Sequence, residues 1–326
     1  MNASVKHLTY AQRPLGAGGP GVTPLTFGAM LIARDPGLKD GVSPALLRAL
    51  EGGVGMIDTA RIYPGSEDII AATLKSWQGP PPLLSSKVAP LGVRTFRHYA
   101  PIAEAFTAAS IRASVEASLK ALNAERLDVI HLHQWFYLWS FEPEWRQTLL
   151  SLREEGKIDR IAISAQDHEH DATLEVIRAK QVDVVQFIYN LFESRPCVSL
   201  LPMATKHGVG TIARCVLDSG ALTGTMDEAA FQAHHFLSGT NVPEYQRRLD
   251  AIKRDFLGGA VKSLDELAIR FVLSDPRVST ITLGLVTTAE VDRALKLVAL
   301  PPLAQAEIEA ISAAHVWTKN AYERLV

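Results

Sequence analysis

The chain has 326 residues, which suits a barrel of about 250 residues with additional segments. Its formal net charge of −2 comes without any basic block, so no nucleic-acid partner is expected. No apolar run approaches the roughly 20 residues of a membrane helix, and the N-terminus lacks the apolar core of a signal peptide. The two cysteines, Cys197 and Cys215, form neither a metal-ligand cluster nor a disulfide framework. We therefore expect a cytoplasmic protein with no membrane partner and no metal site.

Short apolar stretches alternate with amphipathic segments along the chain. Strands are predicted at residues 22–30, 55–58, 83–88, 127–133, 160–164, 182–189, 211–215 and 279–283. Helices are predicted at residues 44–51, 66–77, 110–122, 144–154, 172–179, 200–206, 264–273 and 289–298. Eight units of this kind imply a parallel sheet whose outer face is covered by helices.

This alternation predicts an α/β fold, a closed (β/α)8 TIM barrel, with an open doubly wound sheet as the structural alternative. No linker rich in proline or glycine divides the chain, so we expect one domain over residues 1–326. Residues 222–259 form a long insertion after the seventh strand, and residues 303–326 form a C-terminal tail. The glycine-rich residues 16–21 match the letters of a dinucleotide fingerprint, but an extended segment follows instead of a helix. A turn before the first barrel strand is the better interpretation.

Polar residues recur where successive strands end. Asp58 ends the second strand, Tyr63 follows in the next loop, and Lys87 lies near the end of the third. On the fourth strand, His131 and His133 share one face, and His133 is nearer the end. Because the strand ends of such a barrel surround its active site, these groups should meet there. Taken singly, each also fits a structural role: a turn cap, a cover for the barrel end, an ion pair or a hydrogen-bonded core histidine.

Together these residues resemble the aldo-keto reductases. That family has a strand ending Asp-Thr-Ala, then Tyr and Gly-Ser-Glu, then a strand lysine and a strand-end histidine, which matches Asp58, Tyr63, Lys87 and His133. The resemblance spans about residues 25–298. It implies hydride transfer between a nicotinamide cofactor and a small carbonyl or alcohol, with Tyr63 as general acid or base. Lys87 and Asp58 would support the phenol, and His133 would orient the carbonyl oxygen.

The resemblance also implies a set of cofactor-binding residues: Ser164, Gln186, Arg214, Leu217, Gly220, Leu222, Gly284, Val286 and Glu290. Several depart from the family pattern. Ala165 stands where the family usually has an asparagine, and Arg214 replaces a common aromatic residue. Val286 and Glu290 lie where donors for the adenosine end are usual, with Arg293 nearby. The family habit implies NADPH, but a carboxylate at this position disfavours a 2′-phosphate, so NADH stays possible.

Residues 134–141 contain five aromatic side chains, and this loop should overhang the barrel mouth. Trp135, Phe136 and Tyr137 are therefore candidates for a substrate wall, with packing inside the loop as the alternative. Substrate identity, reaction direction and oligomeric state are left open. So are two other functions: a cofactor-binding regulatory protein without turnover, and a redox-neutral isomerase or epimerase.

Overall fold

The computed structural model describes residues 11–92, 100–142, 144–234, 237, 242–315 and 317. Eight parallel strands close into a barrel in the order β10-β3-β4-β5-β6-β7-β8-β9. They are β3 (Leu25–Gly28), β4 (Met56–Asp58), β5 (Leu83–Val88), β6 (Leu127–Leu132), β7 (Ile158–Ser164), β8 (Val184–Ile188), β9 (Gly210–Arg214) and β10 (Thr280–Gly284). The predicted barrel is confirmed, and the pairing of β10 with β3 excludes the open sheet.

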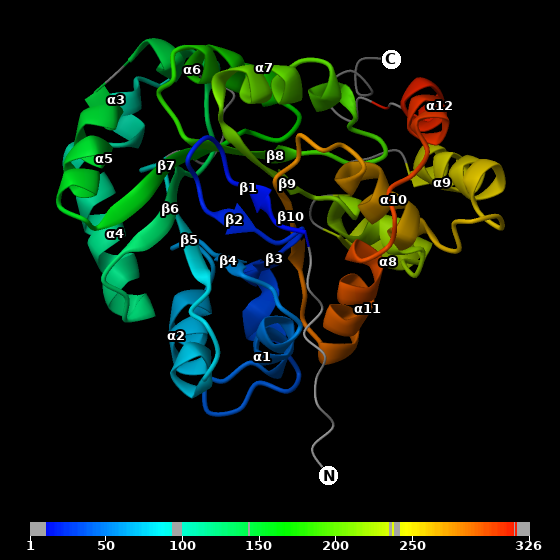
Figure 1. Ribbon diagram of the computed structural model, residues 1–326, viewed down its shortest axis with the longest axis horizontal. Helices are drawn as coiled ribbons and strands as arrows, with labels where there is room; N and C mark the ends of the chain where they lie inside the picture. The colour runs from blue at the N-terminus through cyan, green and yellow to red at the C-terminus, as the bar shows by residue number, and fades with distance from the viewer. Residues whose placement is uncertain are drawn as a thin grey trace.

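The helices form a ring around this barrel (Figure 1). They are α1 (Pro44–Glu51), α2 (Ser66–Ser76), α3 (Ile102–Ala105), α4 (Ala108–Leu122), α5 (Glu144–Glu154), α6 (Leu174–Arg178), α7 (Leu200–His207), α8 (Glu228–Ala233), α9 (Val242–Phe256), α10 (Leu264–Leu273), α11 (Thr288–Val298) and α12 (Gln305–His315). The predicted bounds of α1, α5 and α10 agree with the structure to the residue. In α1, the Ser43 side chain caps the first turn and Pro44 takes its first position, as the sequence signal demands.

A small hairpin, β1 (Arg13–Pro14) with β2 (Gly21–Val22), lies across one end of the barrel (Figure 1). Its turn contains Gly16 and Gly18, both at positive φ, so the glycine-rich stretch is a turn, as expected. The strand predicted at residues 22–30 is confirmed only in part, since β3 covers Leu25–Gly28. The predicted strand divides at Pro24, which has no N–H to donate to a neighbouring strand. Val22 pairs antiparallel with β1 in the hairpin, whereas Leu25 begins the barrel strand β3.

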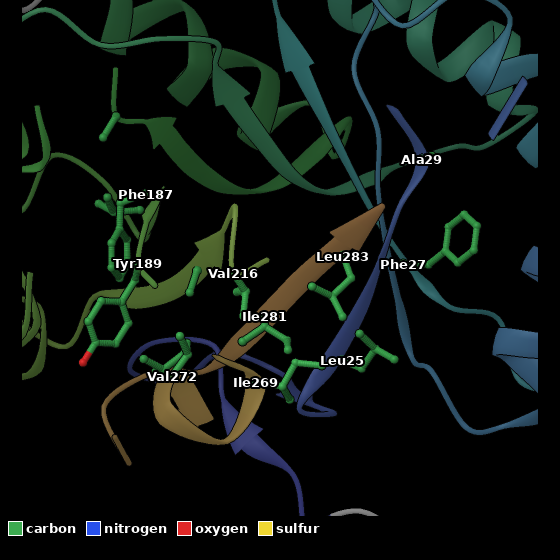
Figure 2. Packing of buried hydrophobic residues seen from close by; sticks show 14 of the residues in the cluster. Leu25, Phe27, Ala29, Phe187, Tyr189, Val216, Ile269, Val272, Ile281 and Leu283 are labelled. Carbon is green, nitrogen blue, oxygen red and sulfur yellow. The ribbon is translucent and has the colours of Figure 1, made fainter. Parts of the chain in front are cut away.

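The strands sort their side chains into two apolar layers. Figure 2 shows the outer layer where Leu25, Ile281 and Leu283 lie beside Ile269 and Val272 of α10. A second cluster fills the lower barrel interior: Leu15, Val22, Met56, Val129, Ala162, Val184 and Ile212. The inward positions nearer the carboxyl ends of the strands are polar. The barrel interior is therefore filled by apolar side chains at the hairpin end and lined by polar side chains at the end where the strands finish.

The insertion and tail form three of these helices. α8 and α9 belong to the insertion and α12 to the tail, and all three gather beside α10 (Figure 1). Tyr245 of α9 packs against Phe231 of α8 and against Trp317, which follows α12. Insertion and tail thus share one aromatic cluster. Among the described residues, no helix is long and apolar enough to cross a membrane.

Candidate active site

An ion pair occupies the centre of the polar end of the barrel. Lys87 Nζ of β5 donates to Asp58 Oδ2 of β4 at 2.7 Å and to the Thr59 carbonyl at 2.8 Å. Lys87 is 1% exposed and Asp58 5%, so neither charge is solvated and each depends on the other. Burial alone would raise the pKa of Asp58, but the neighbouring Lys87 and His131 and the hydrogen bonds from Lys87 and Gln186 lower it. The pair is therefore ionised inside the barrel.

The loop after β4 places Tyr63 beside this pair. Thr59 Oγ1 and Ser66 Oγ lie 2.7 Å apart, and Ser66 Oγ donates to the Tyr63 carbonyl at 3.1 Å. Gly65 adopts φ +66°, which lets the chain turn sharply into α2. Lys87 Nζ lies 5.4 Å from the centre of the Tyr63 ring. The two short motifs, Asp-Thr-Ala at residues 58–60 and Gly-Ser-Glu at residues 65–67, thus shape the loop that holds Tyr63 close to Lys87.

The same loop is anchored to the next strand by Glu67, a residue that our sequence interpretation did not single out. Glu67 is 4% exposed; it accepts from Ser86 Oγ at 2.8 Å and pairs with Arg61. Ser86 precedes Lys87 and points to the opposite face of β5. The spacing of Gly65 to Glu67 contained this signal, since an acidic residue at the start of a helix is favourable there.

His133 follows β6 and faces Tyr63. The two ring centroids are 6.0 Å apart with the planes nearly perpendicular, and the His133 amide donates to the Val88 carbonyl at 2.8 Å. Burial, with Lys87 and Arg214 nearby, lowers the pKa of His133 to about 3. Its ring is therefore neutral near pH 7 and can donate only one N–H. Within the described part of the chain, its Nδ1 is buried without a hydrogen-bond partner.

His131 lies one layer deeper, as its position on the strand predicted. It is fully buried, and its Nε2 lies 3.1 Å from Ser85 Oγ, which donates to Asp58 Oδ1 at 2.9 Å. Burial and the charge of Lys87 lower the pKa of His131 to about 4. Ser85 was not predicted as part of the site. A serine inside a strand carries no distinguishing signal until its neighbours are known.

Ser164 and Gln186 complete the polar floor on the adjacent strands β7 and β8, where they occupy paired positions. The Ser164 hydroxyl donates to the Gln186 amide oxygen at 3.5 Å, and the Gln186 amide nitrogen donates to Asp58 Oδ2 at 3.1 Å. A hydroxyl and an amide side by side form a donor and acceptor set that fits a carboxamide group. Both residues are therefore candidates for binding such a group.

Arg214 ends β9 and reaches across to the loop after β7. Its guanidinium donates to the Ala165 carbonyl at 2.8 Å and to Asp167 Oδ1 at 2.7 Å. Burial would raise the pKa of Asp167, but Arg214 lowers it. Arg214 therefore lies at the barrel mouth close to His133, and its charge is already balanced by a carboxylate.

The segment after β9 has an unusual backbone. Asp218, Ser219 and Gly220 have φ values of +46°, +57° and +96°, and only the last is a glycine. The amides of Gly220 and Leu222 both donate to the Leu217 carbonyl, which tightens the turn. Consecutive left-handed residues are costly and concentrate at functional sites. Leu222 is fully buried, so what this segment offers a ligand is its backbone rather than that side chain.

Gly284 ends β10, Val286 lies in the short connection that follows, and Glu290 lies in the first turn of α11. Thr287 caps α11, and Glu290 completes a capping box in which its Oε2 accepts from the amides of Val286 at 2.8 Å and Thr287 at 3.0 Å. Arg293 is bound by Asp265 through two nitrogens, at 2.9 and 3.0 Å. The Glu290 carboxylate thus already fills the position that an anion would take at this helix end.

The aromatic loop after β6 mostly packs on itself. Trp135 is fully buried, with ring centroids 5.9 Å from Trp139 and 5.3 Å from Trp145. The expectation that Trp135 forms a substrate wall was wrong, because a side chain with no exposed surface has none to offer a ligand. Phe136 is partly buried, whereas Tyr137 is 47% exposed. These two remain candidates.

A profile of the Aldo/keto reductase family matches residues 24–315. Among curated proteins, the chain is 29% identical over 245 residues to aldo-keto reductase YhdN of Bacillus subtilis, covering 70% of each chain. It is 27% identical over 190 residues to the NADH-specific methylglyoxal reductase of Escherichia coli, covering 56% of this chain and 58% of that protein. Among solved structures, aldo-keto reductase AKR11C1 from Bacillus halodurans in its holo form superposes with a TM-score of 0.75 at 22% identity, covering 95% and 99% of the two chains.

Proposed function

The chain belongs to the aldo/keto reductase family, and from that premise we propose that it is a nicotinamide-dependent oxidoreductase. It would reduce an aldehyde or ketone to an alcohol, or run the reverse reaction. The observation that carries the proposal is the convergence of Asp58, Lys87, Tyr63 and His133 at the carboxyl ends of β4, β5 and β6. A purely structural set would not need a phenol and a neutral imidazole facing each other beside a buried cation.

Tyr63 is the proposed general acid for reduction. The oxygen of a carbonyl that accepts a hydride becomes an alkoxide and needs a proton. Loss of the phenolic proton leaves a phenolate, which the nearby Lys87 ammonium stabilises. Asp58 and the Thr59 carbonyl hold that ammonium in place. In the reverse direction the same phenolate takes the proton from an alcohol.

His133 is proposed to orient the substrate. Because its ring is neutral near pH 7, one nitrogen donates a hydrogen bond and no ionised imidazolium competes with Tyr63 as the acid. A donor aimed at the carbonyl oxygen also stabilises negative charge as it develops. Phe136 and Tyr137 are proposed to contact the remainder of the substrate.

The nicotinamide cofactor would supply the hydride. Ser164 and Gln186 would bind its carboxamide, Arg214 would lie beside the ring, and the backbone of Leu217, Gly220 and Leu222 would follow its phosphates. Gly284, Val286 and Glu290 would contact the adenosine end. NADPH is the cofactor of family habit. Within the part of the chain that the structure describes, no cation pairs with the Glu290 carboxylate, and on that ground we propose that NADH is also used.

Turnover and binding together test this function. Purified protein is titrated with NADPH and NADH by fluorescence, then assayed by nicotinamide absorbance against small aldehydes, aromatic aldehydes, ketones and aldoses. The proposal predicts binding and turnover of at least one carbonyl, lost in Tyr63→Phe. A regulatory protein would bind cofactor and reduce no carbonyl. An isomerase would convert substrate with no net change in nicotinamide absorbance.

A further inference from the structure

A continuous run of hydrogen bonds lies beneath Tyr63 and crosses three strands. His131 of β6 contacts Ser85 of β5 at 3.1 Å, and Ser85 donates to Asp58 Oδ1 of β4 at 2.9 Å. The other oxygen, Oδ2, accepts from Lys87 at 2.7 Å and from Gln186 at 3.1 Å. Each oxygen of the Asp58 carboxylate therefore has its own donors, and Ser85, the donor to Oδ1, is itself in contact with His131.

The directions of these bonds fix the state of His131. An ionised carboxylate can only accept, so Ser85 uses its single hydroxyl proton on Asp58. The Ser85 oxygen can then only accept from His131, which requires the proton on Nε2. All three side chains are buried, so no water competes for these positions. His131 is thus a neutral donor in its Nε2–H form.

We propose that His131 and Ser85 are positioning residues that fix the orientation of Asp58 and, through it, of Lys87. The proposal rests on the function proposed above, in which Lys87 serves Tyr63. A carboxylate held only through Oδ2 could rotate, and the ammonium bound to it would move with it. With Oδ1 fastened to Ser85, Lys87 keeps its bonds to Asp58 and Thr59 and stays 5.4 Å from the Tyr63 ring. Hydrogen bonds to an ionised group are the strong kind, which suits them to this role.

Three variants and one control test the proposal in the full-length protein. Ser85→Ala and His131→Leu break the run, whereas His131→Gln keeps a side-chain N–H donor. Thr26→Val is the matched control, because Thr26 is also buried inside the barrel but bonds Thr280, at 2.9 Å, and not Asp58. We expect kcat to fall about tenfold in Ser85→Ala and His131→Leu with KM nearly unchanged. His131→Gln should recover to within about threefold of wild type, and Thr26→Val should stay within about twofold.

The pH dependence separates positioning from mere support of the fold. A displaced Lys87 stabilises the phenolate less, so the basic limb of the kcat profile should move to higher pH in the two broken variants. The other charged or titratable groups around Tyr63 (Asp58, Lys87, His133 and Arg214) are the same in each protein, and His131 itself is uncharged near pH 7, so replacing it removes no charge. An unmoved profile with wild-type kcat in His131→Leu, or equal losses in all four variants, overturns the proposal. If His131→Leu does not fold, Ser85→Ala decides it alone.

A second measurement does not depend on turnover. Nitrogen NMR of histidine-labelled protein reports which ring nitrogen of His131 carries the proton, with His131→Gln used to assign the signal. The proposal requires the Nε2–H form at pH 7, and the Nδ1–H form overturns it. Absence of any carbonyl reduction by wild type would instead refute the proposed function and would leave this spectroscopic result standing.

Discussion

The two sides of the barrel mouth use charged residues in opposite ways. At the ends of β4 to β6, the Asp58–Lys87 pair lies beside the Tyr63 phenol and the neutral His133 imidazole, whose Nδ1 has no hydrogen-bond partner among the described residues. At the ends of β9 and β10, the charges are consumed locally. Arg214 is bound by Asp167, Arg293 by Asp265, and Glu290 by its own helix. A charged residue at a motif position is thus a strong candidate for binding a ligand only if its charge is not already paired within the protein.

This contrast accords with the match to the family pattern on the β4 to β6 side, the proposed catalytic side, and with the departures from it on the β9 and β10 side, the proposed cofactor side. Replacing any one of Asp58, Lys87 or Ser85 leaves a buried charge or donor without its partner, which lowers the stability of the fold. On the other side, each ion pair has one partner about half exposed, Asp167 in one and Arg293 in the other, and exchanging such an exposed charge costs little.

Tyr63→Phe should have the largest effect on turnover. The substitution removes the phenolic hydroxyl but keeps the ring that packs against His133. We expect kcat to fall at least about a hundredfold, the scale of a lost general acid, while cofactor dissociation constants change little. Steady-state assays with a reduced carbonyl, together with cofactor titration, measure both. Turnover near the wild-type rate would remove Tyr63 from its proposed role and leave the contrast without its catalytic side.

Lys87→Met should disable the enzyme and also destabilise it. The substitution strands the Asp58 carboxylate in a site where it is 5% exposed, which costs about 3–5 kcal/mol of unfolding free energy. Adding Asp58→Asn removes the stranded charge, so the double variant should recover part of that stability while staying inactive. Urea denaturation of the three proteins provides the comparison. A double variant less stable than Lys87→Met would contradict the electrostatic account.

Much of the fold was predictable because its signals are local. Apolar runs gave all eight barrel strands, and the Ser43 and Pro44 start signal gave α1 to the residue. Pro24 divided a strand that looked continuous, since the two halves pair in different sheets. The prediction for Trp135 failed because the sequence does not show which aromatic rings of a loop pack against each other. Trp139 and Trp145 bury the Trp135 ring.

The candidate site was predictable only in part. A charged or titratable residue at the end of an apolar strand stands out, which is why Asp58, Lys87 and His133 were found. Ser85 does not stand out, because its importance lies in contacts with two other strands. For Glu290 an available signal was not used: Thr287 and Glu290 have the spacing of a capping box at a helix start. Read as such, the pair predicts that the carboxylate binds its own helix.

His133→Ala should impair turnover more than His131→Ala. His133 faces Tyr63 and would touch the substrate, so its loss should cost about a hundredfold in kcat. His131 acts through Ser85 on a charged group, so its loss should cost nearer tenfold. Parallel kinetics on the two variants, each checked for folding by circular dichroism, give the ranking. The reverse order would mean that the residue contacting the reactant lies one layer deeper than the strand end.

Stability should fall with acid, and His131 should account for one separable part of the loss beside His133, whose pKa is also lowered. Its pKa is about 4 in the folded protein and near 6.5 when unfolded, so between these values the unfolded chain binds more protons. Stability is therefore unaffected above about pH 6.5 and declines as pH falls toward 4, by roughly 2 kcal/mol at pH 5 from this residue alone. Denaturation midpoints of wild type and His131→Gln at pH 7 and 5 test this. An equally steep loss in the variant would assign the effect to other groups.

Glu290→Gln tests the cofactor side, where the expected effect is smallest. In the structure Glu290 caps α11 by accepting from the amides of Val286 and Thr287. A glutamine oxygen can accept the same bonds, so the cap should persist and only the negative charge is lost. If the adenosine end binds here, a 2′-phosphate would meet that charge and compete for those two amides. A 2′-hydroxyl could instead donate to the carboxylate. Because the site is exposed and screened, we expect the preference for NADPH over NADH, measured as the ratio of their dissociation constants, to increase by only about three- to tenfold.

Thr288, exposed at the first position of the same helix, offers a control, since Thr288→Ala changes no charge and should leave the ratio of dissociation constants unchanged. A strong wild-type preference for NADPH that neither substitution alters would place the phosphate elsewhere, and the locally consumed charges of β9 and β10 would then have no bearing on cofactor choice.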